Sequence, residues 1–182
     1  DEGPGAGLPA PGREMEPVYV RPAQAEEKVR HKVLGLVPPL IRPLRPADLP
    51  VVDELEQRLF GDPWPQSFFL DALAASEAVC LVAERHGVIA GYLIATLDAP
   101  QAELQNLATA PDQQRGGIAR ALLDELIAIC RVRGVRDLNL EVRVSNAPAQ
   151  ALYRTHGFRL NGLRRGYYRA PDEDALLMGV RC

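Results

Sequence analysis

A strand that leads into a glycine-opened helix is the feature that most constrains how this chain can fold. Residues 102–109 are expected to form the strand, which Pro111 and Asp112 interrupt. From Gly117 the apolar residues follow helical spacing, at Ile118, Leu122, Leu126 and Ile129. The first N–H groups of that helix have no intrahelical acceptor, and they lie at the positive end of its dipole. Since Gly116 and Gly117 let a ligand reach the backbone, the junction predicts an anion site suited to a phosphate or pyrophosphate.

Nucleotide-binding motifs narrow the choice of ligand. The Gly-Lys-Ser/Thr ending of a P-loop is absent, and only Gly116-Gly117 matches the dinucleotide fingerprint. Residues 114–119 instead read Gln-Arg-Gly-Gly-Ile-Ala, a Q/R-x-x-G-x-G/A sequence. This stretch resembles the acetyl-CoA signature of the GNAT acetyltransferase family. The alternative is an ordinary glycine-opened helix that binds no ligand. The remaining sequence is needed to distinguish these two interpretations.

Composition and charge exclude several classes of protein. With 182 residues, of which 47% are apolar and 25% charged, the chain is long enough for one globular domain with a real core. A net charge of −3 is not the basic footprint of a nucleic-acid-binding protein, and no apolar run approaches the length of a membrane span. Three cysteines without metal-ligand spacing predict free thiols, no metal site and a cytoplasmic location, with Cys80 and Cys130 buried.

Residues 1–39 differ from the rest and are interpreted as an accessory arm. The arm starts with residues 1–14, which are rich in Gly and Pro and cannot build a core. A short extended piece is expected at Val18–Val20 and a weak helix over Gln24–Leu36. The globular domain is expected to span residues 40–182.

From residue 40 the pattern is regular and predicts an α/β fold. Apolar alternation and apolar runs predict strands at 41–44, 78–83, 88–97, 102–109, 137–144, 158–168 and 175–180. Helical spacing and end signals predict helices at 46–61, from Pro65 to Leu73, from Gly117 to Gly134, and at 147–155. A strand, a helix and a strand in succession form a parallel pair. The expected order is βααβββαβαββ, a mixed central β-sheet flanked by helices.

This order is that of the GNAT fold, so the resemblance extends over residues 40–182. Further matching pieces are Asp62-Pro-Trp, Asn106-Leu-Ala, Leu140-Glu-Val-Arg, Ser145-Asn-Ala, Ala151-Leu-Tyr, Gly157-Phe, Arg164-Arg-Gly-Tyr-Tyr and Glu173-Asp-Ala-Leu-Leu-Met. The last two are narrower and resemble the branch that acetylates protein N-termini. Within that branch the chain is similar to the RimI type, which acts on the N-terminal alanine of a bacterial ribosomal protein. Ala119 and Thr109-Ala110 depart from the family pattern, but neither departure removes a catalytic group.

The resemblance implies two catalytic residues. A free α-amino group has a pKa of about 8, so a base assists its reaction. Glu141, near the carboxyl end of the parallel strand, is the implied general base, acting directly or through a water. Tyr153 is the implied acid for the departing thiolate, because a phenol with a pKa of about 10 is protonated at neutral pH. The alternatives are a solvated strand glutamate and a tyrosine packed at a helix end, while His156 is expected to cap that helix.

The resemblance also implies a site for acetyl-CoA that needs no metal. Unpaired strand N–H groups at Leu107, Ala108 and Thr109 would bond the acetyl oxygen and the pantetheine amides. The pyrophosphate would lie on a loop and helix start that comprise Gln114, Arg115, Gly116, Gly117, Ile118, Ala119 and Arg120. Asn146 would touch the pantetheine arm. Arg120 is equally expected as an ordinary surface residue.

An acceptor groove is implied beside the last two strands. Tyr167 and Tyr168 are expected on opposite faces of one strand, so that at most one points into the groove. Phe60 and Trp64 would line the other wall. All four aromatic residues are equally compatible with core or lid packing. The acidic pair Glu173-Asp174 would fix the hairpin or the substrate amine.

The expected activity is transfer of an acetyl group from acetyl-CoA to the N-terminal α-amino group of a protein, with a ribosomal protein as the family expectation. The alternatives are acetylation of a lysine side chain or a small amine, and a non-catalytic CoA-binding module, against which Glu141 and Tyr153 argue. The expected partner is a protein or peptide N-terminus, without nucleic acid or membrane, and a mild acidic balance would favour a basic peptide. The chain is expected to be a monomer or a weak dimer.

Overall fold

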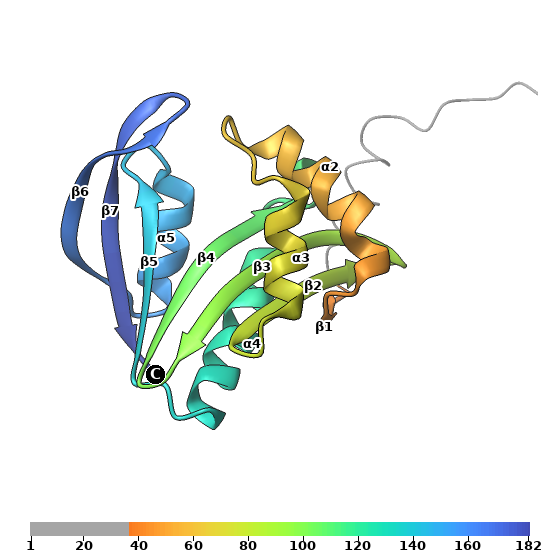
Figure 1. Cartoon of the computed structure of the whole chain (residues 1–182), viewed down its shortest axis with the longest axis horizontal. Coiled ribbons are helices and arrows are strands. Elements are labelled where there is room, and N and C mark those ends of the chain that lie inside the picture. Colours follow the sequence, from red (N-terminus) through yellow and green to blue (C-terminus); the bar gives the residue numbers. More distant parts are fainter. Residues whose placement is uncertain (1–36) are drawn as a thin grey trace, which may run out of the picture.

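A seven-stranded mixed sheet runs through the computed structural model, which describes residues 37–182. Its strands are β1 (Leu40–Pro43), β2 (Ala78–Arg85), β3 (Val88–Asp98), β4 (Gln101–Thr109), β5 (Asp137–Arg143), β6 (Arg159–Arg169) and β7 (Asp172–Arg181). They lie in the order β1-β2-β3-β4-β5-β7-β6 (Figure 1). Only β4 and β5 pair in parallel, as predicted, and the other neighbouring strands are antiparallel. The extended piece and the helix expected in the arm lie outside the described residues.

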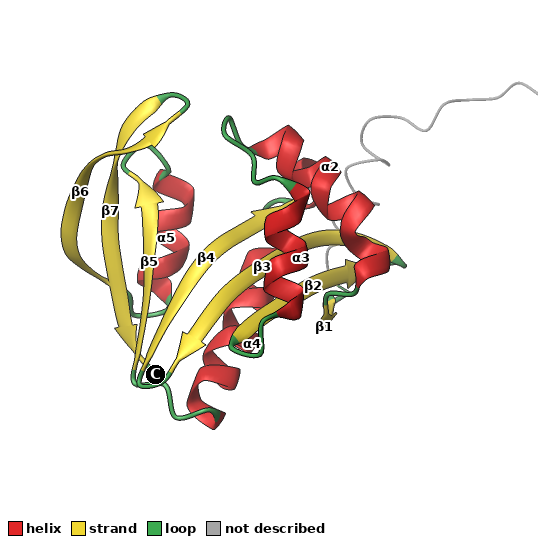
Figure 2. Ribbon diagram, viewed as in Figure 1, coloured by secondary structure: helices red, strands yellow, loops and turns green. Residues whose placement is uncertain are grey.

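Four α-helices cover the two faces of this sheet. They are α2 (Leu49–Leu59), α3 (Gln66–Ala74), α4 (Ile118–Val132) and α5 (Ala147–Thr155), with 3-10 turns at Pro46–Asp48 and Pro111–Gln113. Helices α2 and α3 pack on one face and helices α4 and α5 on the other (Figure 2). The predicted order βααβββαβαββ is confirmed. The long predicted helix at 46–61 divides into a 3-10 turn and α2.

Two apolar clusters hold the helices on the sheet. Behind the sheet, the predicted stripe of α4 is buried, and its Leu122 and Leu126 are fully enclosed as the helix packs on β3, β2 and β4. In front of it, Val52 of α2 and Phe69 of α3 pack on Tyr92 of β3. Because both faces of the central strands are covered, burial of apolar surface supports the sheet from each side. Cys130 is buried as expected, whereas Cys80 is only half-buried, and the cysteines are free.

The two parallel strands separate after a short stretch of pairing. Strand β5 is paired with β4 only from Gln101–Leu104, opposite residues 137–140. At this point β4 carries one extra residue, Gln105, relative to β3, so its later side chains change face. Leu104 packs behind the sheet, but Ala108 packs in front of it. This bulge and the short parallel pairing open the sheet at its centre.

Candidate active site

The glycine-opened turn has the geometry that an anion site needs. Gly117 is left-handed, with φ 81°, and starts α4. The first backbone bond of the helix runs from Ala121 N–H to the Gly117 carbonyl, so earlier N–H groups have no intrahelical acceptor. Arg115 is also left-handed, with φ 61°. Such a conformation is uncommon outside glycine and gathers at ligand-binding loops.

Arg85, at the end of β2, supports this turn from behind. Its guanidinium donates to the Gly116 carbonyl at 2.7 Å, and the residue is only 6% exposed. A Cβ atom at Gly116 would lie 2.6 Å from Arg85 Nη1, so this contact requires glycine there. The sequence analysis missed Arg85, because a lone arginine at a strand end predicts no contact with a loop some 30 residues away.

The end of β4 offers polar groups toward the gap in the sheet. Leu107, Ala108 and Thr109 pair with β3 on one side, but none of them pairs with β5 on the other. The Thr109 hydroxyl is buried and, among the described residues, has no hydrogen-bond partner. An orphaned buried hydroxyl beside unpaired strand amides fits a ligand that carries amide and carbonyl groups. Leu107 to Thr109, which the sequence analysis predicted to bind the cofactor, therefore lie at the edge of the gap.

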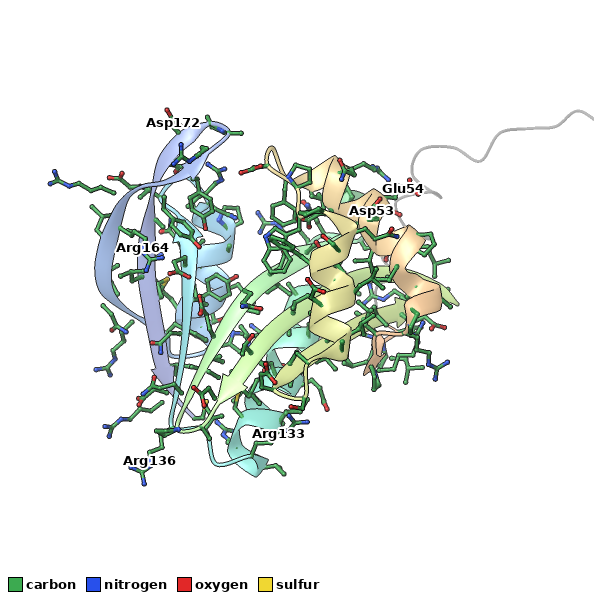
Figure 3. All side chains as sticks on the ribbon, viewed as in Figure 1. Asp53, Glu54, Arg133, Arg136, Arg164 and Asp172 are labelled. Carbon is green, nitrogen blue, oxygen red and sulfur yellow. The ribbon has the colours of Figure 1, made fainter. Side chains whose placement is uncertain are left out.

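Glu141 faces a groove on the side of the sheet that carries α2 and α3. The groove measures about 660 Å³, and it is lined from the five strands β3 to β7 by residues that include Asp98, Glu103, Glu141, Asn161 and Arg164. The side chain of Glu141 is 14% exposed, and Arg164 lies 3.1 Å from it. Burial raises the pKa of Glu141, as does the neighbouring carboxyl of Glu103, while Arg164 opposes the rise. In Figure 3, Arg164 lies over the β6 and β7 ribbons.

Tyr153 lies on α5 and is buried in the apolar cluster on that face of the sheet. It packs against Phe158, with ring centroids 5.6 Å apart. Burial raises its pKa above that of an ordinary phenol, and Tyr168 adds to the rise, so Tyr153 keeps its proton at neutral pH. Tyr168 also interacts with Glu141. Tyr153 and Glu141 therefore both lie within electrostatic range of the Tyr168 phenol.

The expected alternation of Tyr167 and Tyr168 is wrong. Their rings pack against each other, with centroids 5.0 Å apart, and both phenols interact with Glu141. The reason is an irregularity in β6. Three residues separate Arg164 from Tyr168, whereas only one residue separates their partners on β7, Ala175 and Glu173, so the regular alternation of side chains is interrupted. Within it, Gly166 is left-handed. Burial, followed by the effect of Tyr167, raises the pKa of Tyr168 to about 12.

Glu173 fixes the hairpin between β6 and β7. It accepts hydrogen bonds from the Ser145 N–H and hydroxyl and pairs with Arg143 at 3.2 Å. These contacts, the Ser145 N–H first, hold the pKa of Glu173 below its usual value. Arg143 also bonds the carbonyls of residues 170 and 171 and lies 4.2 Å over the Tyr168 ring. Asp174 accepts from the Gly166 N–H. Of the two expectations for the acidic pair, the structure supports the hairpin.

The loop between α2 and α3 approaches the β6–β7 hairpin. Phe60 is partly exposed at the end of α2, and Trp64 packs edge-on against Phe68. A Cβ atom at Gly61 would lie 2.3 Å from the Ala170 carbonyl oxygen. The loop and the hairpin therefore meet at this point.

Glu56 anchors this loop and is the main residue that the sequence analysis missed. It is 1% exposed, inside α2, and accepts hydrogen bonds from the Trp64 N–H, the Tyr92 hydroxyl and the Asn106 amide. A buried carboxylate is stable only when donors satisfy it in this way. The signal was present, because Glu56 stands in the apolar stripe of α2, seven residues after the buried Leu49.

Glu56→Gln should lower the free energy of unfolding by about 2 kcal/mol, because the amide has one acceptor oxygen and cannot satisfy all three buried donors. Chemical denaturation monitored by tryptophan fluorescence measures the change. Glu54→Gln is the matched control on the exposed side of the same helix, where we expect a change within about 0.5 kcal/mol. Equal stability of the two variants would contradict a structural role for the buried carboxylate.

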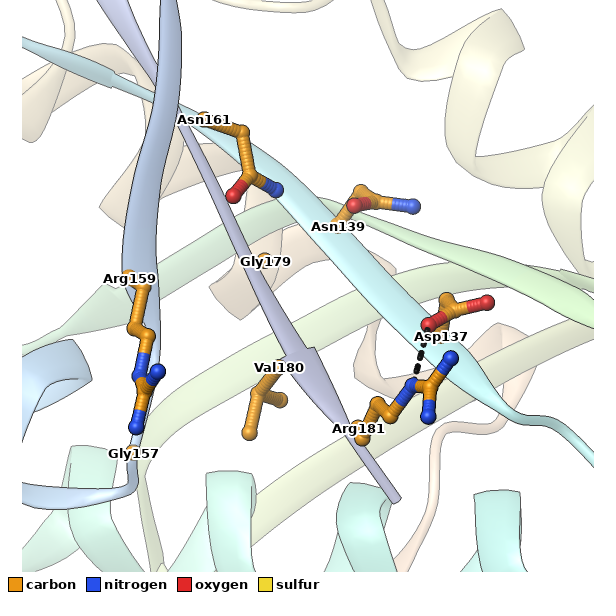
Figure 4. Close-up of a pocket in the computed structure, with 8 residues that line it drawn as sticks. All are labelled: Asp137, Asn139, Gly157, Arg159, Asn161, Gly179, Val180 and Arg181. Atoms are coloured by element: carbon orange, nitrogen blue, oxygen red, sulfur yellow. Dashed lines mark ion pairs between the residues drawn. The ribbon is translucent and has the colours of Figure 1, made fainter.

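The remaining predicted residues lie around this site. The Asn146 side chain accepts from the Ala149 N–H at 3.2 Å and caps α5, and Arg120 is exposed on the first turn of α4. His156 lies 2.8 Å from the Leu152 carbonyl, as expected for a cap at the end of α5, and it lies 3.1 Å from Asp124 of α4, a contact that was not expected. A second hollow of about 460 Å³ adjoins the groove and shares Asn139 and Asn161 with it (Figure 4).

Two further properties concern the whole described part of the chain. Among residues 37–182, no helix combines the length and the apolar character that crossing a membrane requires. Within the same residues, His, Cys, Asp and Glu side chains form no group of three or more that is suited to a metal ion.

Comparison with known proteins agrees with this geometry. The model of the acetyltransferase (GNAT) family matches residues 49–158. The [ribosomal protein bS18]-alanine N-acetyltransferase of Escherichia coli K12 is 39% identical over 142 residues, which cover 77% of this chain and 95% of that protein. The N-alpha-acetyltransferase RimI of Mycobacterium tuberculosis is 40% identical over 147 residues, 78% of this chain and 91% of that protein.

Solved structures give the same result. The crystal structure of the ribosomal-protein-S18-alanine N-acetyltransferase from Escherichia coli superposes with a TM-score of 0.73 at 37% identity, covering 79% of this chain and 93% of that one. Arabidopsis thaliana NAA60 in complex with a bisubstrate analogue has a TM-score of 0.72 at 20% identity, a level of similarity that supports a common fold only. The family match, the identity to curated relatives and the shared fold coincide, and the chain belongs to the GNAT family of acetyltransferases.

Proposed function

We propose that this chain transfers the acetyl group of acetyl-CoA to the N-terminal α-amino group of a protein, with the N-terminal alanine of ribosomal protein bS18 as its substrate. Family membership supports the donor, and the names of the relatives at 37–40% identity support the acceptor. The observation that carries the proposal is the opening between β4 and β5, with an anion-binding turn behind the sheet and a carboxylate in a groove before it.

Acetyl-CoA would enter from the side of α4 and α5. The N–H groups at residues 117–120 would bind its pyrophosphate, on the turn that Arg85 holds in place. The unpaired amides of residues 107–109 and the Thr109 hydroxyl would bond the pantetheine amides and the acetyl oxygen. Asn146 lies at the start of α5 beside this path, with its amide nitrogen as a further donor.

The reaction removes two protons from the acceptor nitrogen and delivers one proton to the sulfur. Glu141 would take the first proton from the α-ammonium group, directly or through a water, and the neutral amine would attack the thioester carbonyl. The carbon–sulfur bond then breaks, Tyr153 would donate its proton to the departing thiolate, and the second proton from the nitrogen would restore the phenol. The raised pKa of Glu141 supports the first role, because a stronger base removes an amine proton more readily. The high pKa of Tyr153 keeps its proton in place until the thiolate forms.

The contact between the α2–α3 loop and the β6–β7 hairpin supports a chain end as acceptor. Phe60 and Trp64 lie at this loop, and Tyr167 and Tyr168 lie on β6 of the hairpin. Because the loop and the hairpin meet at Gly61 and Ala170, a peptide would enter between them by its terminus rather than lie across them as a loop. This favours an N-terminal amine over a lysine inside a folded protein.

A peptide panel assayed for CoA release tests the proposal. A peptide that starts with the N-terminal alanine of bS18 should release CoA with saturation, and its copies with other first residues should rank below it. The matched control is the same peptide with an acetylated α-amine and one internal lysine, for which we expect no release above background. Release from the blocked lysine peptide, or from small amines at a similar rate, would overturn the assignment to protein N-termini.

A further inference from the structure

Glu103 is a second carboxyl group in the groove, and the chemistry above assigns it no role. It lies on β4 in the stretch that pairs with β5, opposite Asn139 and therefore two residues before the position of Glu141, on the same face of the sheet. Glu103 and Glu141 line the same groove, and the Glu103 carboxyl is close enough to raise the pKa of Glu141. Glu141 is mostly buried, whereas Glu103 is exposed to solvent, so Glu103 lies between the buried carboxyl and water.

We propose that Glu103 is a positioning residue that acts through Glu141: it shares the proton that Glu141 removes from the acceptor amine and returns that proton to water. This inference rests on the proposed function. In the step, the N–H bond of the ammonium breaks, an O–H bond forms on Glu141, and the proton then lies in a hydrogen bond between the two carboxyl groups. It leaves from the exposed oxygen of Glu103, and both carboxylates are restored for the next turnover.

The physical reason is the cost of two negative charges in contact. Two adjacent carboxylates bind a proton more tightly than either alone, and they titrate as a pair. The other groups that face Glu141 come from β6: Arg164 at 3.1 Å, which favours the ionised form, and the phenols of Tyr167 and Tyr168, which stay neutral. Asp98 of β3 lines the same groove. Glu103 therefore offsets the cation of Arg164 and keeps Glu141 basic enough to act on an amine.

The test is Glu103→Gln, which keeps the size and the hydrogen-bonding reach of the side chain but removes its charge. We expect the acidic limb of the kcat/KM profile to move to lower pH by about one unit, because Glu141 loses its like-charged neighbour. Water screens an exposed partner, so the shift is smaller than the several units of a fully buried pair. Glu125→Gln is the control: it removes an exposed carboxylate on α4, outside the groove, and the acidic limb of its profile should stay in place.

A second measurement does not depend on acetyl transfer. Carbon-13 NMR of the side-chain carboxyl groups, with Glu141→Gln to assign the signal, should show the Glu141 midpoint at lower pH in Glu103→Gln than in the wild type. Midpoint and kinetic limb both unmoved, within about 0.2 pH units, would overturn the inference. If the wild type acetylates no peptide while the midpoint moves, the proposed function fails and the coupling of the two carboxyl groups stands.

Discussion

Tyr153→Phe should lower kcat about 100-fold while leaving the dissociation constant of acetyl-CoA within about twofold of the wild-type value. The substitution removes only the hydroxyl group and keeps the ring. The raised pKa of Tyr153 means that the wild-type hydroxyl carries its proton throughout the neutral range. Without it, the departing sulfur must leave as a thiolate with no donor. Phenylalanine retains the packing against Phe158, so the fold and the cofactor site should persist. Steady-state kinetics and equilibrium binding of acetyl-CoA separate the two effects.

Tyr92→Phe is the matched control for this prediction. It removes the other deeply buried phenol, which donates to Glu56 rather than facing the opening in the sheet. We expect it to lower the free energy of unfolding by about 1–2 kcal/mol and to leave kcat within severalfold of the wild type at temperatures where the protein is folded. If Tyr153→Phe and Tyr92→Phe lowered kcat alike, a loss of rigidity would explain both results and the assigned acid would be wrong.

Local patterns predicted most of the fold, because the features concerned depend on neighbours in sequence. The helical spacing from Ile118 and the left-handed Gly117 at its start follow from side-chain period and glycine chemistry. The cap at Asn146 and the end of α5 at a left-handed Gly157 follow from similar local rules. The positions of Glu141 and Tyr153 came instead from the resemblance to a known family.

Contacts between distant segments were not predictable in this way. Arg85 reaches a turn 31 residues later, and Glu56 binds a strand residue 50 positions away. No periodicity encodes such pairs, since each depends on how whole elements pack. The misplaced faces of Tyr167 and Tyr168 have a related cause, because an irregular strand breaks the period of two on which the prediction depended. Two of the residues that were not predicted support neighbouring segments: Arg85 holds the glycine turn, and Glu56 anchors the loop between α2 and α3.

Glu141→Gln should lower kcat/KM for the acceptor peptide by about 10²-fold to 10³-fold at neutral pH, and it should change the shape of the pH profile. In the wild type, activity falls as the pH drops through the pKa of Glu141, which lies above the ordinary value for a glutamate, because only the ionised carboxyl accepts a proton. In Glu141→Gln, this fall of activity at low pH should disappear. The remaining rise with pH should follow the α-amine itself, with a midpoint near 8.

The control for Glu141→Gln is Glu125→Gln, which removes one negative charge from the exposed side of α4. Its profile should match that of the wild type, so an effect of net charge alone is separated from the loss of the base. Acetyl-CoA binding should be unchanged in both variants, because the turn that would bind the pyrophosphate lies on the other side of the sheet. Wild-type kcat/KM in Glu141→Gln, with the acidic limb still present, would assign the proton to another group. Glu103, which touches Glu141 and faces water, would then be the first candidate.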